Sequence, residues 1–183
     1  MKKFALALLV MLPLFSLAAF AQGGGWTVGV GGEVGVPTGD FNTAYSAGFG
    51  GMGTVGYVVD PNFTVTGKVG FLSFSGKEIT GTIGGVAYSV TPPSLTIIPI
   101  LVGGRYYFMP PADMRVYGSV DLGMFNVNNN VGTKFGFSPA LGAMFKAGDN
   151  MNVDVHANYT SVSTEGSSSS WIGVGIGLNW DLK

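Results

Sequence analysis

The sequence predicts an all-β protein, an eight-stranded antiparallel up-and-down transmembrane β-barrel preceded by a cleaved signal peptide. Three observations lead to this prediction. The chain of 183 residues is 46% hydrophobic but only 10% charged, whereas an average soluble domain has roughly 25% charged residues. Its N-terminus has the pattern of a secretory signal, which predicts export. Beyond that signal, apolar residues recur at every second position in short segments and form no second run long enough for a membrane-spanning helix.

The composition excludes several classes of function. With no cysteine, the chain has neither a disulfide framework nor a cysteine-ligated metal site. A single histidine leaves little for a histidine-based metal site. The charges are sparse and nearly balanced, so the chain lacks the basic surface that binds nucleic acid. We therefore expect no metal, no cofactor and no nucleic-acid partner.

Residues 1–21 are interpreted as the signal peptide. Two lysines follow the first methionine, an apolar run comes next, and Ala19-Phe20-Ala21 provides a cleavage site of small residues. A membrane anchor helix is the alternative, but about 17 apolar residues are few for a segment that spans a bilayer. Residues 22–183 then form a single barrel domain.

Eight segments with alternating side chains are the predicted strands. Each has large apolar residues on one face and mostly Gly, Ser, Thr or Asn on the other, as where Ile172, Val174 and Ile176 alternate with glycines. Segments of about 9–12 residues, tilted by about 45°, span the apolar band of an outer-membrane barrel. The predicted strands are residues 26–36, 49–59, 63–71, 97–108, 116–126, 135–147, 153–161 and 171–182.

Two features fit this alternation poorly. Pro99 and Pro139 fall inside predicted strands, where each removes a hydrogen bond from the ladder. Both are near the external ends of their strands, where a β-bulge is tolerable. Ile97 and Leu101 are apolar but face inward by parity.

The connections between the segments alternate in length. Residues 60–62, 109–114 and 148–150 form short connections, whereas 37–48 and 75–95 form long ones. Outer-membrane barrels have short periplasmic turns and longer external loops, so the mature chain is expected to start in the periplasm. The second long connection alternates partly and is expected to extend a hairpin above the membrane. An exposed edge of that hairpin can accept a strand from a partner.

The apolar face of the strands is expected to point outward, toward lipid. A soluble barrel with an apolar cavity is the alternative, but the polar face consists mainly of Gly, Ser, Thr and Asn and would be a poorly solvated surface. Aromatic residues on the apolar face also gather at both ends of the strands, as at a lipid–water interface. They are Trp26, Tyr57, Phe63, Tyr106, Phe108, Phe145 and Trp180 at the periplasmic end, and Phe49, Phe71, Phe135, Phe137 and Tyr159 at the external end.

The inward face carries a set of charged residues that forms the candidate site. An eight-stranded barrel is just wide enough for its side chains to fill, and a buried charge without a partner is strongly destabilising. We therefore expect a paired structural network that plugs the lumen, in preference to a gated polar path. Lys68 and Asp121 are the best candidate pair, because both are near mid-barrel by depth. The network comprises Glu33, Lys68, Arg105, Arg115, Asp121, Asp154 and His156.

His156 is also the only candidate for catalysis. With a serine it can form the nucleophile–base pair of a lipid hydrolase. By parity, however, it faces the lumen near a periplasmic turn, whereas such an enzyme needs a site that faces lipid at the external leaflet. Its neighbours Asp154 and Asn158 lie on the same face. We therefore expect a hydrogen-bonding role and no catalytic residue.

Two local matches carry a family resemblance. Residues 98–108, Ile-Pro-Ile-Leu-Val-Gly-Gly-Arg-Tyr-Tyr-Phe, resemble a strand that recurs in the outer membrane protein β-barrel domain family. The last strand resembles the recognition signal of the barrel assembly machinery, with Gly177, Trp180 and Leu182 in its glycine, aromatic and hydrophobic positions. It departs from many members by ending in Lys183 and not in an aromatic residue. The mature chain as a whole resembles the small eight-stranded barrels, the group that contains outer membrane protein X and the membrane domain of outer membrane protein A.

The resemblance implies a bacterial outer-membrane location, with the barrel assembly machinery and outer-membrane lipids, including lipopolysaccharide, as partners. It implies no particular activity, because the group has structural, adhesive, channel-forming and enzymatic members. We expect a non-enzymatic monomer with a plugged polar lumen, which acts in envelope structure or in surface interaction through its external loops. A narrow porin-like channel for small or hydrophobic solutes is the alternative. A lipid-modifying outer-membrane enzyme is the third hypothesis.

Overall fold

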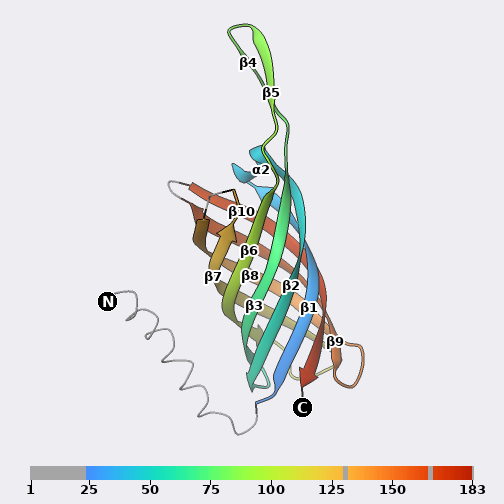
Figure 1. Ribbon diagram of the computed structural model, residues 1–183. Coiled ribbons are helices and arrows are strands. Elements are labelled where there is room, and N and C mark those ends of the chain that lie inside the picture. The colour runs from blue at the N-terminus through green and yellow to red at the C-terminus, as the bar shows by residue number, and fades with distance from the viewer. Residues whose placement is uncertain (1–23, 130–131, 165–166, 183) are drawn as a thin grey trace, which may run out of the picture.

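Eight antiparallel strands close into a barrel, as predicted. The computed structural model describes residues 24–129, 132–164 and 167–182, and the predicted signal peptide lies outside them. The strand order around the barrel is β1-β10-β9-β8-β7-β6-β3-β2, and every neighbouring pair is antiparallel. A hairpin projects from one end of the barrel, and both ends of the described chain lie at the other (Figure 1). By the usual orientation of such barrels, the hairpin end is external and the other is periplasmic.

The barrel strands are longer than the alternating segments predicted. The β9–β10 pairing continues through the serine- and threonine-rich stretch at the external end, where Ser161 still pairs with Ser170. Backbone hydrogen bonds sustain these extensions, so they need no apolar face. The strands are β1 (Trp26–Thr38), β2 (Tyr45–Asp60), β3 (Phe63–Gly76), β6 (Leu95–Tyr107), β7 (Met114–Val127), β8 (Gly132–Lys146), β9 (Met151–Thr164) and β10 (Ser167–Leu182).

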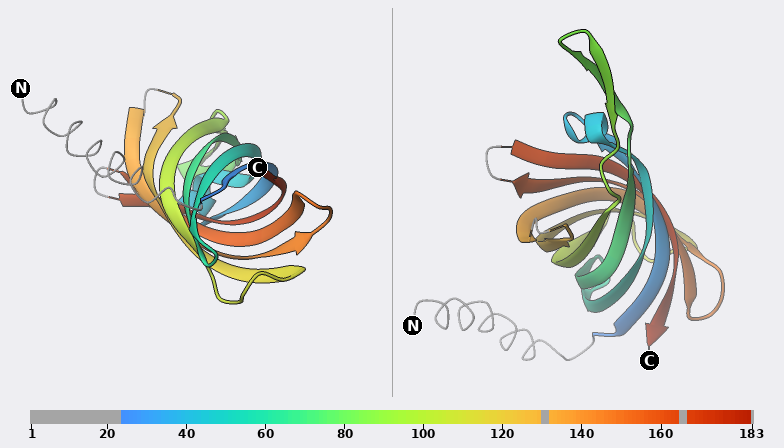
Figure 2. Two further views of the ribbon diagram at one scale, coloured as in Figure 1. Left: turned by 90° about the horizontal axis from the view of Figure 1, so that it is seen from below. Right: turned by 45° about the horizontal axis from the view of Figure 1, so that its top comes forward.

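The long connections carry structure of their own. The hairpin expected in the second consists of β4 (Ile79–Ile83) and β5 (Val86–Val90), which pair only with each other. Gly84 and Gly85 have φ of 59° and 84°, and a tight two-residue hairpin turn needs such positive values at both positions. The first long connection contains a short helix, α2 (Phe41–Ala44), which was not predicted; it lies at the same end of the barrel as the hairpin (Figure 2). No helix in the described ranges is long and apolar enough to cross a membrane.

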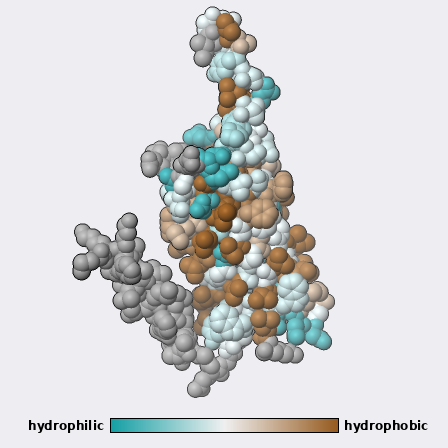
Figure 3. All heavy atoms as spheres, viewed as in Figure 1, coloured by the Kyte–Doolittle hydropathy of each residue, from teal (hydrophilic) through white to brown (hydrophobic). Residues whose placement is uncertain are grey.

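The apolar face of the strands points outward, as expected for a barrel in lipid. Large apolar side chains on this face are exposed on the isolated chain, for example Val30 at 58% and Leu141 at 65%. Figure 3 shows apolar side chains over the barrel wall. A soluble monomer seldom exposes so extensive an apolar surface, but lipid tails cover it in a membrane. Phe49 and Phe108, one from each expected aromatic group, are both exposed on this surface.

The two prolines inside strands do not lie at bulges. The β3–β6 pairing is interrupted beside Pro99 but resumes in the same register. The β8–β9 pairing is interrupted and resumes in the same way beside Pro139. A proline removes one hydrogen-bond donor, whereas a bulge requires an additional residue on one strand. Register shifts occur instead in the β2–β3 pairing, between Tyr45 and Gly48 and between Val58 and Asp60.

Glycine allows neighbouring strands to approach closely at Gly50 in β2. A Cβ at this position would overlap the backbone oxygen of Phe71 on β3, whereas a Cβ at Gly67 on β3 would have nothing within 4 Å. We expect Gly50→Ala to lower the free energy of unfolding by about 1–3 kcal/mol, because a backbone atom cannot move aside as a flexible side chain can. Gly67→Ala is the matched control and should change it little. Urea unfolding in lipid vesicles measures both, and equal losses would contradict the clash.

Candidate functional site in the barrel lumen

The first charged cluster of the lumen joins β3 to β7. Lys68 Nζ lies 2.8 Å from Asp121 Oδ2, which is the pair expected from depth. Thr66 donates a hydrogen bond of 3.2 Å to the other oxygen of Asp121. In the strand registers, Gly103 of β6 lies between Thr66 and Asp121, and a Cβ there would overlap the Asp121 carboxylate. The glycine therefore leaves the space in which the ion pair crosses the intervening strand.

The second cluster is centred on Asp154 of β9, which is 3% exposed. Its Oδ2 lies 3.1 Å from Arg105 Nη2. Its Oδ1 accepts hydrogen bonds from the Tyr117 hydroxyl at 2.8 Å and from His156 Nδ1 at 3.1 Å. Two hydrogen-bond donors and one opposite charge compensate for much of the lost hydration of the carboxylate.

Glu33 of β1 extends this second cluster across β10. Its Oε2 lies 3.9 Å from His156 Nε2, and Asn158 Nδ2 donates to both of its oxygens at 3.4 Å. Gly175 lies between Glu33 and His156 in the strand registers, and a Cβ there would overlap the imidazole ring. Both clusters therefore cross an intervening strand at a glycine.

Aromatic rings continue from this cluster toward the periplasmic end. Arg105 Cζ lies 4.2 Å from the ring centroid of Tyr117, and Tyr117 packs edge to face on Tyr107 at 5.8 Å. Arg115 Cζ lies 3.7 Å from the centre of the Tyr107 ring, and its Nη2 donates to the carbonyl of Pro61. Within the described part of the chain, no acid lies within salt-bridge distance of Arg115. It therefore stands apart from the two clusters, which contain the other six residues of the expected network.

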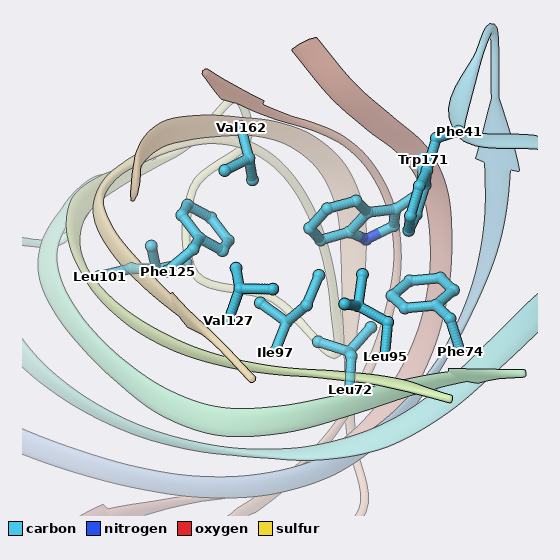
Figure 4. Close-up of a cluster of buried hydrophobic side chains, with 10 residues drawn as sticks. All are labelled: Phe41, Leu72, Phe74, Leu95, Ile97, Leu101, Phe125, Val127, Val162 and Trp171. Atoms are coloured by element: carbon cyan, nitrogen blue, oxygen red, sulfur yellow. The ribbon is translucent and has the colours of Figure 1, made fainter. Parts of the chain in front are cut away.

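The external half of the lumen is filled by apolar side chains. Phe74 is fully buried, and Phe125 and Trp171 are 1% exposed. Phe41 of α2 covers this group, with ring centroids 5.1 Å from Phe74 and 6.3 Å from Trp171 (Figure 4). We call these residues the apolar plug: Phe41, Leu72, Phe74, Leu95, Ile97, Leu101, Phe125, Val127, Val162 and Trp171.

The apolar plug was not predicted, although Ile97 and Leu101 do point inward as their parity indicated. The signal that would have found it is the loss of alternation at the external strand ends. Phe71 and Leu72 are adjacent and both apolar, so one of them must face the lumen. Leu72 is the inward one, at 1% exposed against 51% for Phe71.

Two polar spaces remain in the lumen below the plug. A cavity of about 60 Å³ lies among the charged clusters, where Lys68, Asp121 and His156 line it, and it has room for a few water molecules. A larger space of about 440 Å³, the vestibule, lies among the periplasmic turns, where Pro61 lines it. Arg105 lines both spaces. The lumen is therefore polar toward the periplasm and apolar at the external end.

The residues expected to form the assembly signal lie on β10. Gly177, Trp180 and Leu182 are near its periplasmic end, and Trp180 pairs with Val28 of β1 at the seam that closes the barrel. Their role in assembly stays a prediction.

Comparisons with known proteins agree with this architecture. The chain matches the family model "Outer membrane protein beta-barrel domain" over residues 7–180. No curated protein matches the sequence. Among solved structures, OprG of Pseudomonas aeruginosa is 11% identical with a TM-score of 0.66, over 87% of this chain and 96% of that one.

Two further structures resemble the chain at similar identity. Neisserial surface protein A is 13% identical with a TM-score of 0.61, over 87% of this chain and 99% of that one. Ail of Yersinia pestis, solved with the heparin analogue sucrose octasulfate, is 12% identical with a TM-score of 0.54, over the same two shares. At such low identity, the likeness extends to the fold alone. With the family model matching nearly the whole chain, the protein belongs to the outer membrane protein β-barrel domain family of the bacterial outer membrane.

Proposed function

We propose that this protein is a non-enzymatic outer-membrane barrel with a closed lumen, which acts in surface interaction through its external hairpin. The observation that carries the proposal is the β4–β5 hairpin, which projects well beyond the barrel (Figure 1). Ile79 pairs with Val90 and Gly81 with Tyr88, so these residues share one face of the hairpin. That face is exposed, with Val90 at 57% and Tyr88 at 42%.

The edges of the hairpin suit an extended partner. In the described part of the chain, neither β4 nor β5 pairs with any other strand, and residues 79–93 contain no charged residue. Proteins usually protect free edges with charged residues or proline, and here the prolines lie only at the base, at Pro92 and Pro93. A partner can add a strand by main-chain hydrogen bonds while the apolar face holds its side chains.

Charges placed on the apolar face of the hairpin test this proposal. We expect vesicles that carry the protein to bind immobilised extended peptides with alternating apolar side chains. Val86→Lys with Val90→Lys should weaken that binding at least about tenfold, because binding would bury two unpaired ammonium groups. The matched control is Ala87→Lys with Ser89→Lys, on the opposite face of the same strand. If both pairs of changes have the same effect, the apolar face is not the binding surface.

A narrow channel is the second candidate. The vestibule and the central cavity favour it, because Arg105 lines both and the two spaces adjoin. The apolar plug opposes it, because it fills the external half of the lumen. Conductance in planar bilayers distinguishes the two: a closed lumen gives no steady current. If the wild type conducts, Lys68→Ala and Asp121→Ala show whether their ion pair narrows the path.

The remaining expectations belong to the same proposal. His156 is held between Asp154 and Glu33 in the lumen, which supports a structural and not a catalytic role for it. Lipid, including lipopolysaccharide, would surround the apolar wall. The barrel assembly machinery would recognise the end of β10. A closed barrel leaves no strand edge free in the wall, which supports a monomer.

A further inference from the structure

Several hydrogen-bond donors at the floor of the vestibule have poor acceptors or none. Arg105 is only 6% exposed, yet its Nε has no partner in the structure. Its Nη1 and the Tyr107 hydroxyl both point to the sulfur of Met144, at 3.7 Å and 3.2 Å, and a thioether is a weak acceptor. Among the described residues, the Nε of Arg115 is also buried without a partner. Buried donors are nearly always satisfied, so a group of exceptions indicates a place for water or for a ligand.

The residues that carry these donors line one space. Arg105, Tyr107, Arg115 and Met144 all line the vestibule, and Arg105 and Arg115 are the only arginines in the sequence. A guanidinium group presents paired N–H donors that match two oxygens of a carboxylate or a phosphate. The rings of Tyr117 and Tyr107 lie against the two guanidinium groups, which holds the donors in place before any ligand arrives.

We propose that the vestibule binds a small periplasmic molecule by its anionic group, a carboxylate or a phosphate, between Arg105 and Arg115. The oxygens of that group accept hydrogen bonds from the guanidinium groups of Arg105 and Arg115 and from the Tyr107 hydroxyl, in place of the weak Met144 sulfur acceptor. A space of about 440 Å³ is of the size that holds small-molecule ligands. The ligand enters from the periplasm, because the apolar plug fills the other end of the lumen.

Charge around the vestibule disfavours an anionic group of high charge. Asp154 already neutralises Arg105, so Arg115 and Lys146 are the cations that remain along the vestibule. Asp113, Asp149 and Asp181 also line the vestibule, and they would repel a ligand of higher negative charge. A monocarboxylate therefore suits the site better than a phosphate does.

The two arginines allow a direct test on the folded protein. Arginine labelled with ¹³C and ¹⁵N gives two Nε signals in the full chain in lipid nanodiscs, and detection through Cζ makes them independent of proton exchange with water. Arg115→Lys assigns them. Sodium acetate and sodium phosphate are the probes, with sodium chloride at equal ionic strength as the control. We expect both Nε signals to shift saturably with acetate, and less strongly with phosphate.

Variants separate a built site from a general salt effect. Arg115→Gln should weaken acetate binding, read at the Arg105 signal, by about tenfold, the effect of losing one charge-assisted hydrogen bond. Lys77→Gln is the control, since Lys77 is an external cation that bonds Asn42. If the Arg105 signal shifts saturably with acetate or with phosphate, that probe carries the anionic group that the site prefers. The proposal is overturned if the shifts equal those with chloride, or if Arg115→Gln binds acetate as the wild type does. The unpaired donors would then bind water.

Discussion

Asp154→Ala is expected to lower the free energy of unfolding by about 3–5 kcal/mol, because it leaves a buried cation without its counter-ion. Arg105 is 6% exposed, and the Asp154 carboxylate 3.1 Å away is its only ion-pair partner in the described part of the chain. The same change removes the acceptor for the Tyr117 hydroxyl and for His156 Nδ1. Urea unfolding in lipid vesicles, followed by the gel mobility of unheated samples, measures the loss.

Asp181→Ala is the matched control for this prediction. Asp181 lies at the periplasmic end of β10, where its only side-chain hydrogen bond within the described residues is an exposed one from Asn152 at 3.2 Å, so its loss should change stability by no more than about 0.5 kcal/mol. Replacing both members of the buried pair, as in Arg105→Met with Asp154→Leu, should cost less than Asp154→Ala alone, because no unpaired charge remains. Equal losses for Asp154→Ala and Asp181→Ala would show that the buried pair contributes little.

Part of the charged network was predictable because strand parity fixes the face of a residue and the turns fix its depth. Lys68 and Asp121 have the same face and similar depth, and they do meet. The Arg105–Asp154 pair was not predictable, since β6 and β9 have two strands between them. Which residues meet across the lumen depends on the stagger of every strand between them, and a sequence alone does not determine that register.

The apolar plug and α2 were not predicted, for a different physical reason. The inward face was expected to be mainly polar, but the external half of the lumen contains side chains that pack against one another, as in a protein core. The helix α2 has four residues, and Asp40 before it makes no capping hydrogen bond through its side chain. So short a helix is not stable alone. The burial of Phe41 in the plug holds it in place, and that contact is tertiary.

Trp171→Ala should also lower the free energy of unfolding by about 3–5 kcal/mol, because it opens a cavity inside the apolar plug. Trp171 is 1% exposed, and its ring centroid lies 5.5 Å from Phe74 and 6.0 Å from Phe125. Trp171→Phe should cost less, partly because the indole N–H is buried without a partner in the part of the chain that the structure describes, so its removal loses no hydrogen bond there. Trp26→Ala is the control. Trp26 is 55% exposed on the outer wall, so its removal leaves no internal cavity and should cost much less.

Trp171→Ala also tests how the lumen is closed. The plug blocks the external half, and the two ion-paired clusters lie below it around a cavity of about 60 Å³. The lumen is therefore closed at two places along its length, so removing one of them should not open a path for ions. We therefore expect no steady current through Trp171→Ala in planar bilayers, even though its stability falls. A steady current would show that the plug is the only barrier and that the ion-paired clusters do not close the lumen.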